Sequence, residues 1–190
     1  MTYQTEPNKG IDPVAIPAAI STTIAIFATG GTIDKFYFDA KDKFCVGEPQ
    51  IESVLAQANV TFDYTLESIV RKDSLDLTAT DIALICDTVL AAKTRRILIT
   101  HGTDALLSTA RALKSRHCTE KTIVLIGAMQ PELMRASDAH FNVGYGIAAA
   151  QLLPPGVYAA MNGCIFDPDS AVKNVDKGVF QSASQQNKSN

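Results

Sequence analysis

Residues 24–33 read Ile-Ala-Ile-Phe-Ala-Thr-Gly-Gly-Thr-Ile and combine an apolar run with a double glycine. The run at 24–28 contains β-branched and aromatic side chains, which predicts a buried strand. Two glycines then predict a tight turn, with the hydroxyls of Thr29 and Thr32 on either side of it. Ligands of open α/β sheets bind at the carboxyl ends of strands, where a hydroxyl can serve as a nucleophile.

Apolar runs and helical patterns alternate along the rest of the chain. Strands are expected at 22–28, 62–70, 96–100, 122–126 and 156–161, and helices at 50–58, 78–92, 105–116 and 137–152. This alternation is typical of βαβ units. The expected fold is α/β, a Rossmann-like or flavodoxin-like three-layer sandwich with a mostly parallel sheet in a single domain. Residues 29–47, with glycine, mixed charge and aromatics, are expected to form a long loop.

The domain is expected to span residues 22–182. Residues 1–21 are expected to be a flexible lead-in, because prolines interrupt the uncharged stretch and acidic residues precede it where a signal peptide would be basic. Residues 183–190 are polar and are expected to form a disordered tail. No targeting or membrane segment is expected, and the expected location is cytoplasmic.

Composition and charge narrow the classes of function. The 190 residues are 46% hydrophobic, which suits one globular domain. The formal net charge of −3 gives no electrostatic reason to expect binding to nucleic acid or to an anionic membrane. The cysteines show no paired spacing, which favours reduced thiols in a cytoplasmic protein. They are Cys45, Cys86, Cys118 and Cys164.

A second strand end carries a hydroxyl and a carboxylate. The apolar residues 97–99 lead into Thr-His-Gly-Thr-Asp at 100–104, after which a helix is expected to begin. Backbone N–H groups at that helix start favour a negative charge, such as a substrate carboxylate or a developing oxyanion. Thr103 and Asp104 are therefore candidate site residues, and capping of the helix is their alternative role.

Lys121 directly precedes the buried run at 122–126 and the Gly-Ala-Met-Gln-Pro loop at 127–131. A lysine at the start of a strand is commonly a surface residue whose stem packs on apolar neighbours. If its amine instead reached Thr103 and Asp104, it could move a proton from the threonine hydroxyl. The three side chains would then work as a triad, following the logic of Ser-His-Asp.

The motifs at 29–33, 100–104 and 121–131 together resemble the bacterial-type L-asparaginase and glutaminase family. The resemblance covers residues from about 23 to about 182. It is a resemblance to the shortened, single-domain members, equivalent to the family's N-terminal domain. Because a second domain helps to enclose the substrate in typical members, weaker binding of a free amino acid is expected, and a homo-oligomer is the expected assembly.

The resemblance also implies a role for each motif residue. Thr32 would be the nucleophile that attacks the side-chain amide carbon of L-asparagine and forms an acyl-enzyme, which water then hydrolyses. Thr103 would work with Lys121 in proton transfer, and Asp104 would hold the substrate's α-amino group. Reasoning from the residues alone leaves open which threonine attacks first.

The family's substrate-carboxylate loop resembles Asp-Ser-Leu-Asp at 73–76, which points to Ser74 with Asp76 in support. A polar loop before a helix is the alternative reading of this segment. The substrate-binding residues implied by the resemblance are Gly31, Ser74, Asp76, Gly102, Thr103, Asp104 and Ala128.

The family also uses a tyrosine on the loop that follows the first motif. Phe44 stands at the aligned position and has no hydroxyl, so Tyr37, five residues after Thr32, is the expected substitute. The alternative is that Tyr37 packs as one aromatic residue of the cluster at 36–38.

His101 and His140 lack metal-ligand spacing, and the double glycine matches no dinucleotide or phosphate fingerprint, so neither a metal nor a cofactor is expected. The leading hypothesis is an amidohydrolase acting on L-asparagine, a small-molecule partner. The alternatives are a catalytically silent domain that binds an amino acid or regulates a partner, and an amidohydrolase that prefers glutamine or another amide. Since one methylene is worth only about 1–3 kcal/mol in a pocket, the sequence leaves asparagine and glutamine open.

Overall fold

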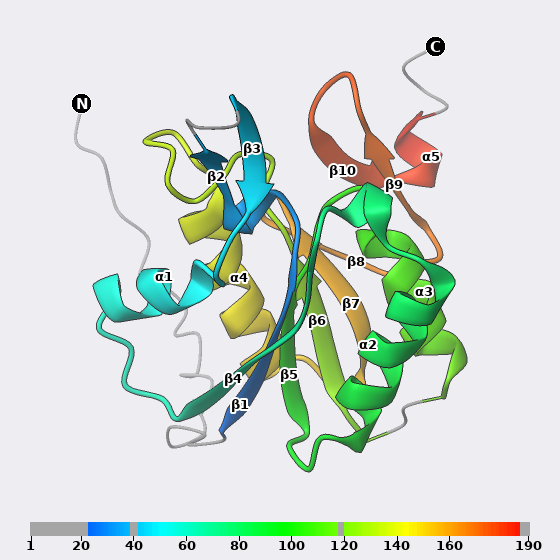
Figure 1. Cartoon of the computed structure of the whole chain (residues 1–190). Helices are drawn as coiled ribbons and strands as arrows, with labels where there is room; N and C mark the ends of the chain where they lie inside the picture. Colours follow the sequence, from blue (N-terminus) through cyan, green and yellow to red (C-terminus); the bar gives the residue numbers. More distant parts are fainter. Residues whose placement is uncertain (1–22, 39–41, 118–119, 187–190) are drawn as a thin grey trace, which may run out of the picture.

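A six-stranded sheet forms the centre of the computed structural model, which describes residues 23–38, 42–117 and 120–186 (Figure 1). Its strand order is β4-β1-β5-β6-β7-β8. The first five strands are parallel, and β8 is antiparallel to β7. The strands are β1 (Ile24–Gly30), β4 (Tyr64–Lys72), β5 (Arg96–Thr100), β6 (Thr122–Ile126), β7 (Gly156–Met161) and β8 (Cys164–Phe166).

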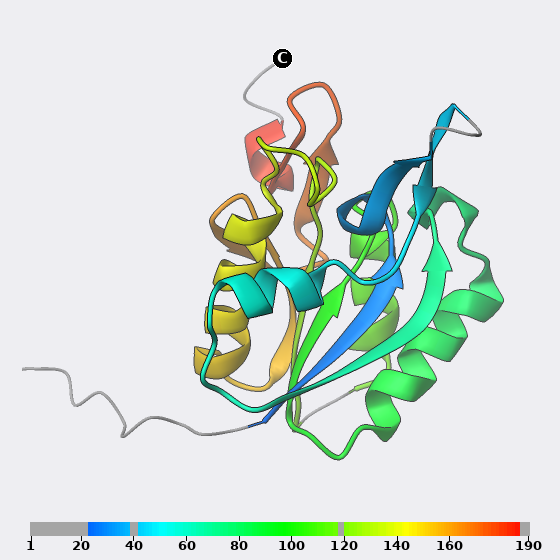
Figure 2. The same cartoon turned by 60° about the vertical axis from the view of Figure 1, so that its left-hand side comes forward.

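Helices cover both faces of this sheet, as Figures 1 and 2 show. The helices are α1 (Ile51–Gln57) and α4 (Ala139–Leu152) on one face, and α2 (Ala79–Ala91) and α3 (Leu106–Ser115) on the other. Alternate residues of the central strands supply the two cores: Ile26 faces α1 and α4, whereas Phe27 faces α2 and α3. The three-layer, mostly parallel α/β fold expected from the sequence is therefore confirmed, in the flavodoxin-like strand order.

Two helix starts show how local chemistry sets the boundaries. Thr78 caps α2 through a reciprocal capping box with Asp81. Asp138 precedes α4, but its carboxylate accepts hydrogen bonds from the loop before it, and Ser137 accepts the N–H of Ala139 instead. The helix start is thereby tied to the loop at 127–130.

The expected long loop at 29–47 is wrong, because it contains a 3-10 turn, η1 (Thr32–Asp34), and a hairpin of β2 (Lys35–Phe38) and β3 (Lys43–Val46). The sequence also misses β8 and a second hairpin, β9 (Ala171–Asn174) and β10 (Val179–Ser182). A four-residue strand is too short to show a periodic pattern. Both hairpins stand above the carboxyl ends of the parallel strands (Figure 1).

The expected disordered tail is wrong at its beginning, since Ala183–Gln186 form the short helix α5. The expected lead-in at 1–21 lies outside the described residues. Among the helices of the described residues, none is long and apolar enough to cross a membrane.

Candidate functional site

Three strand ends meet where the glycines of the two motifs lie. Gly31 follows β1 with φ of 86°, and a Cβ there would lie 2.3 Å from the Cα of Gly102, which follows β5. A Cβ on Gly102 would lie 2.5 Å from the Cβ of Ser74, which begins η3 (Ser74–Asp76) after β4. Only glycine permits these contacts. The ends of β4, β1 and β5 therefore meet at the point where the strand order reverses, the usual binding position in this fold.

Thr103 and Asp104 meet a lysine that comes from β9. Thr103 is 4% exposed. Lys173 donates from Nζ to Thr103 Oγ1 at 2.8 Å and to Asp104 Oδ1 at 2.6 Å. The lysine side chain is 19% exposed, and partial removal from water strengthens its attraction to the carboxylate. A hydroxyl, an amine and a carboxylate are thus in direct contact, the combination that the sequence predicts, but with a different lysine.

The prediction that Lys121 reaches Thr103 is wrong. Lys121 stands at the amino end of β6, and its Nζ donates to the carbonyl oxygen of Ala92. The five residues of β6 span about 16 Å, because a strand rises about 3.3 Å per residue. Lys121 consequently lies at the edge of the sheet opposite to the strand ends that carry the hydroxyls.

Little in the sequence distinguishes Lys173 in advance. It lies in a four-residue strand and is 70 residues from Thr103 along the chain. Its only signal is a lysine beside apolar residues in the segment Ala-Val-Lys at 171–173. Contact with the site arises from the β9–β10 hairpin, which the local pattern does not reveal.

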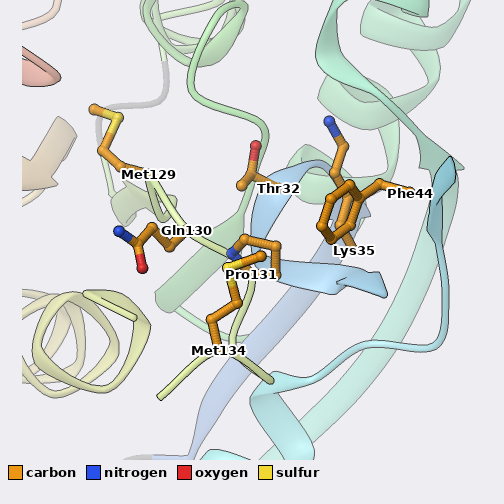
Figure 3. Close-up of a pocket in the computed structure, with 7 residues that line it drawn as sticks. All are labelled: Thr32, Lys35, Phe44, Met129, Gln130, Pro131 and Met134. Carbon is orange, nitrogen blue, oxygen red and sulfur yellow. The ribbon is translucent and has the colours of Figure 1, made fainter. Parts of the chain in front are cut away.

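Thr32 lies on an open pocket of about 470 Å³, and none of Thr103, Asp104 and Lys173 is among the residues that line it. In Figure 3 its hydroxyl and the ammonium of Lys35 point the same way, with the loop at 129–131 on one side and Phe44 on the other. Among the described residues, the hydroxyl of Thr32 has no hydrogen-bond partner. The lining residues are Thr32, Lys35, Phe44, Met129, Gln130, Pro131 and Met134.

An ion pair joins the β2–β3 hairpin to the turn that carries Ser74. Lys35 Nζ contacts the carboxylate of Asp73, whose other oxygen accepts the N–H of Leu75 at 3.1 Å. Burial opposes ionisation of Asp73, but the bonds from Lys35 and the backbone outweigh it and hold its pKa below the usual value. Ser74 is buried against Gly102, whereas Asp76 is exposed.

Tyr37 does not line the pocket. Its hydroxyl donates to Asp42 at the tip of the hairpin, and its side chain is half exposed. Phe44, the neighbour of Tyr37 across the hairpin, lines the pocket instead, with the two ring centres 5.6 Å apart. The expectation that Tyr37 supplies a hydroxyl beside Thr32 therefore finds no support in this arrangement.

The loop at 127–131 contributes differently from what the resemblance implies. The side chain of Ala128 is fully buried in the core against α4. The side chains that reach the pocket are those of Met129, Gln130 and Pro131, which the sequence does not single out. A Cβ on Gly127 would lie 3.0 Å from Cγ2 of Thr103, so this loop also packs beside the second threonine.

Two buried titratable groups lie next to the two threonines. Burial raises the pKa of Asp34 to about 7, although the N–H of Gln50 at 2.8 Å and the charge of Arg71 act against it. Burial lowers the pKa of His101 to about 4. Both side chains are therefore favoured in their uncharged forms.

Hydrogen bonds determine the tautomer of His101. Its Nδ1 lies 2.9 Å from the carbonyl oxygen of Gly102, which can only accept, so Nδ1 carries the proton. Its Nε2 then accepts from the hydroxyl of Thr109 at 2.9 Å. A neutral histidine thus holds the turn that carries Thr103.

The chemistry available at the site is that of hydroxyls, an amine and carboxylates. Across the described residues no group of three or more His, Cys, Asp or Glu side chains could hold a metal ion. Thr103 and Lys173 can exchange a proton at a distance of 2.8 Å, and Thr32 presents a second hydroxyl to the pocket.

The relatives of this chain include proteins named as asparaginases and glutaminase-asparaginases. The chain is 32% identical over 175 residues to a "Glutaminase-asparaginase" of Acinetobacter glutaminasificans, covering 82% of this chain and 50% of that protein. It is 30% identical over 175 residues to "L-asparaginase 2" of Escherichia coli, covering 84% and 49%.

A solved structure, "The thermostable L-asparaginase from Thermococcus kodakarensis", superposes with a TM-score of 0.74 at 27% identity, covering 84% of this chain and 51% of that one. The chain thus spans about half the length of the relatives it matches. Since the family model "Asparaginase, N-terminal" matches residues 23–187, the chain belongs to the asparaginase family.

Proposed function

We propose that this chain carries an amidohydrolase site that converts L-asparagine to L-aspartate and ammonia. The observation that supports it most is the contact of Lys173 Nζ with both Thr103 Oγ1 and Asp104 Oδ1, beside the turn that holds Thr32. Family membership and the names of the relatives favour the same reaction.

In the proposed reaction the hydroxyl oxygen of Thr32 attacks the side-chain amide carbon of the substrate. The hydroxyl proton passes to the departing nitrogen, the C–N bond breaks, and ammonia leaves an ester on Thr32. Water then attacks the ester carbon, and a proton from it passes through Thr103 and Lys173 to the Thr32 oxygen. The ester C–O bond breaks, which restores the Thr32 hydroxyl and releases aspartate. Holding the two hydroxyls and the amine in fixed positions is what makes each transfer fast.

Charged and polar groups around the site suit an amino-acid substrate. Asp104 is partly exposed and offers a carboxylate for the α-amino group, while Ser74 and the cation of Lys35 lie on the side of β4 and suit the α-carboxylate. Opposite charges at the two ends orient the substrate so that its amide carbon faces the hydroxyls.

The substrate class has a second candidate, because three relatives named "Glutaminase-asparaginase" are 30% to 32% identical to this chain over the matched residues. Ammonia assays with asparagine and glutamine in parallel separate the two substrates. Assembly as a homo-oligomer and a cytoplasmic location remain part of the proposal. The solved relatives include a "Probable Cytoplasmic L-asparaginase from Campylobacter jejuni".

The first experiment compares ammonia release from L-asparagine by the wild type, Thr32→Ala and Thr103→Ala. We expect at least roughly a hundredfold loss of kcat in both variants, because each removes a reacting or proton-transferring hydroxyl. Thr61→Ala, on a different segment of the chain, is the control and should retain full activity. A wild type that releases no more ammonia than Thr32→Ala would sink the proposal.

A catalytically silent amino-acid-binding domain is the second candidate. The observation that favours it is Phe44, which lines the pocket beside Thr32 without a hydroxyl. Stabilisation of the protein by asparagine or aspartate without turnover would support this role, because a ligand that binds only the folded state raises its stability.

A further inference from the structure

We infer that Asn162 is a positioning residue for Lys173, and that Asn142 links it to the pocket wall at Met129 and Gln130. The inference rests on the proposed function, in which Lys173 moves a proton. Both side chains lie outside the site, and together they fix the position of Lys173 relative to the pocket wall.

Asn142 is the centre of the link. It is fully buried in α4, and its Nδ2 donates to the carbonyl oxygen of Gly127 at 3.1 Å and to Asp138 Oδ2 at 2.9 Å. Its Oδ1 accepts the N–H of Asn162 at 3.2 Å. An amide offers two donor hydrogens and an acceptor, and here all three are used. A carboxylate would face two acceptors, and an apolar side chain would leave buried groups unpaired.

One end of the link fixes the pocket wall. Asp138 accepts the N–H of Met129 at 2.9 Å and the N–H of Gln130 at 3.1 Å. Both of these residues line the pocket beside Thr32. The carboxylate and Asn142 therefore hold the backbone of the loop at 127–130.

The other end of the link reaches the strand beside Lys173. Asn162 Oδ1 accepts the N–H of Phe180 at 2.9 Å, and Phe180 pairs directly with Lys173 across the β9–β10 hairpin. Asn162 has a left-handed backbone with φ of 54°, which asparagine adopts more readily than most residues. The side chain thus restrains the hairpin at the residue pair that includes the lysine.

A separate anchor holds the base of the hairpin. Arg111 of α3 donates to the carbonyl oxygens of Pro168 at 2.9 Å and of Ala171 at 3.0 Å. The hairpin therefore stays attached when the bond from Asn162 is removed. We expect the change to be confined to the fit of Lys173 against Thr103.

The test is the variant Asn162→Gly, which tolerates the left-handed backbone and removes only the side-chain acceptor. The rate at which a dilute acetylating reagent labels Lys173 in the folded protein is measured by mass spectrometry. We expect labelling to rise roughly fivefold, the effect of one lost hydrogen bond. We also expect kcat for asparagine to fall by a similar factor with little change in KM.

Two further variants make the test specific. Asn162→Asp keeps an acceptor oxygen and a residue suited to the left-handed backbone, so labelling and kcat should return toward wild type. Asn59→Gly is the matched control, because Asn59 has φ of 48° and is exposed after α1.

Unchanged labelling of Lys173 in Asn162→Gly overturns the inference. An equal rise at Lys121 also overturns it, because that partly buried amine is held by Ala92 far from Asn162 and would indicate general loosening. Labelling is measured without substrate. A wild type that releases no ammonia would therefore refute the proposed function, while the labelling would still decide whether Asn162 positions Lys173.

Discussion

The two threonines of the site have contrasting surroundings. Thr103 is buried at the end of β5, and its hydroxyl already contacts Lys173, which Asp104 holds. Thr32 follows β1 on an open pocket, and its hydroxyl has no partner among the described residues. The end of β5 thus carries a preassembled group of a hydroxyl, an amine and a carboxylate, whereas the end of β1 carries a hydroxyl that lines an open pocket.

The structural elements next to the two threonines also differ. The Thr103 side is fixed by a buried neutral histidine, His101, and by the β9–β10 hairpin. The Thr32 side is covered by the β2–β3 hairpin, which an ion pair between Lys35 and Asp73 ties to β4. These surroundings suit the proposed hydrolysis, in which Thr103 and Lys173 move protons at a fixed distance and Thr32 meets a substrate that enters from the pocket.

The largest expected effect separates the two lysines. Lys173→Met should lower kcat roughly 10²- to 10⁴-fold, because it removes the amine in contact with Thr103. Lys121→Met is the matched control and should leave kcat unchanged, since that amine contacts Ala92 at the opposite edge of the sheet. Ammonia release measures both. Activity lost with Lys121→Met and kept with Lys173→Met would reverse the assignment.

The second prediction concerns the two buried titratable groups. Asp34 has a folded-state pKa of about 7 against an ordinary value of 3.8, so its contribution to stability falls as pH rises from about 4 to about 7. His101 has a pKa lowered to about 4 from 6.5, so its contribution falls as pH drops through that interval. Between pH 4 and 6.5 the two contributions therefore act in opposite directions.

Replacing Asp34 by Asn removes the pH-dependent contribution of Asp34 to stability. The free energy of unfolding of Asp34→Asn, relative to wild type, should rise with pH and level off above about 7. The total gain expected is on the order of 4 kcal/mol, since each unit of pKa corresponds to about 1.4 kcal/mol. Denaturant unfolding between pH 4 and 8 measures this difference, and a difference that does not vary with pH would contradict the prediction.

A third prediction tests whether the end of β5 must stay in contact with the ends of β1 and β4. Gly102→Ala places a Cβ 2.5 Å from the Cβ of Ser74 and 3.2 Å from the Cα of Gly31, so it should destabilise the fold by about 1–3 kcal/mol and lower activity. Gly144→Ala is the control, because Gly144 lies in α4 with nothing within 4 Å of an added Cβ. This variant should be more stable than the wild type by about 0.5–1 kcal/mol. Equal stability of the two variants would show that the strand ends tolerate separation.

The sequence could predict features that depend on local patterns, but not contacts that depend on distant segments. The strand that ends at Thr32 and the helix that begins after Thr78 are local patterns, and both are found where the sequence predicts them. Proximity of Thr103 and Asp104 to the glycine turn follows from parallel strands ending at one edge. Lys173 could not be found this way, because its contact depends on a hairpin of two four-residue strands.

Lys121 lies away from the site for a physical reason. In a parallel sheet the residue before a strand and the residue after it lie at opposite edges, so a motif that spans the strand cannot bring both of its ends to one site. Lys121 and the loop that begins at Gly127 are such ends of β6. The loop reaches the site and the lysine does not. The direction of β6 thus excludes Lys121 from the site.

The smallest expected effect concerns the open wall at Thr32. Phe44→Tyr adds a hydroxyl to a ring that lines the pocket, and we expect kcat for asparagine to rise by up to roughly tenfold as the new group orients the Thr32 hydroxyl. Tyr37→Phe removes a hydroxyl that donates to Asp42 outside the pocket, so its kcat should stay at the wild-type value. The pair is well matched because the two rings contact each other across one hairpin. A fall in kcat with Tyr37→Phe would assign the hydroxyl of Tyr37 to the reaction. It would also mean that the β2–β3 hairpin rearranges when substrate binds, since the tip of this hairpin now holds that hydroxyl away from Thr32.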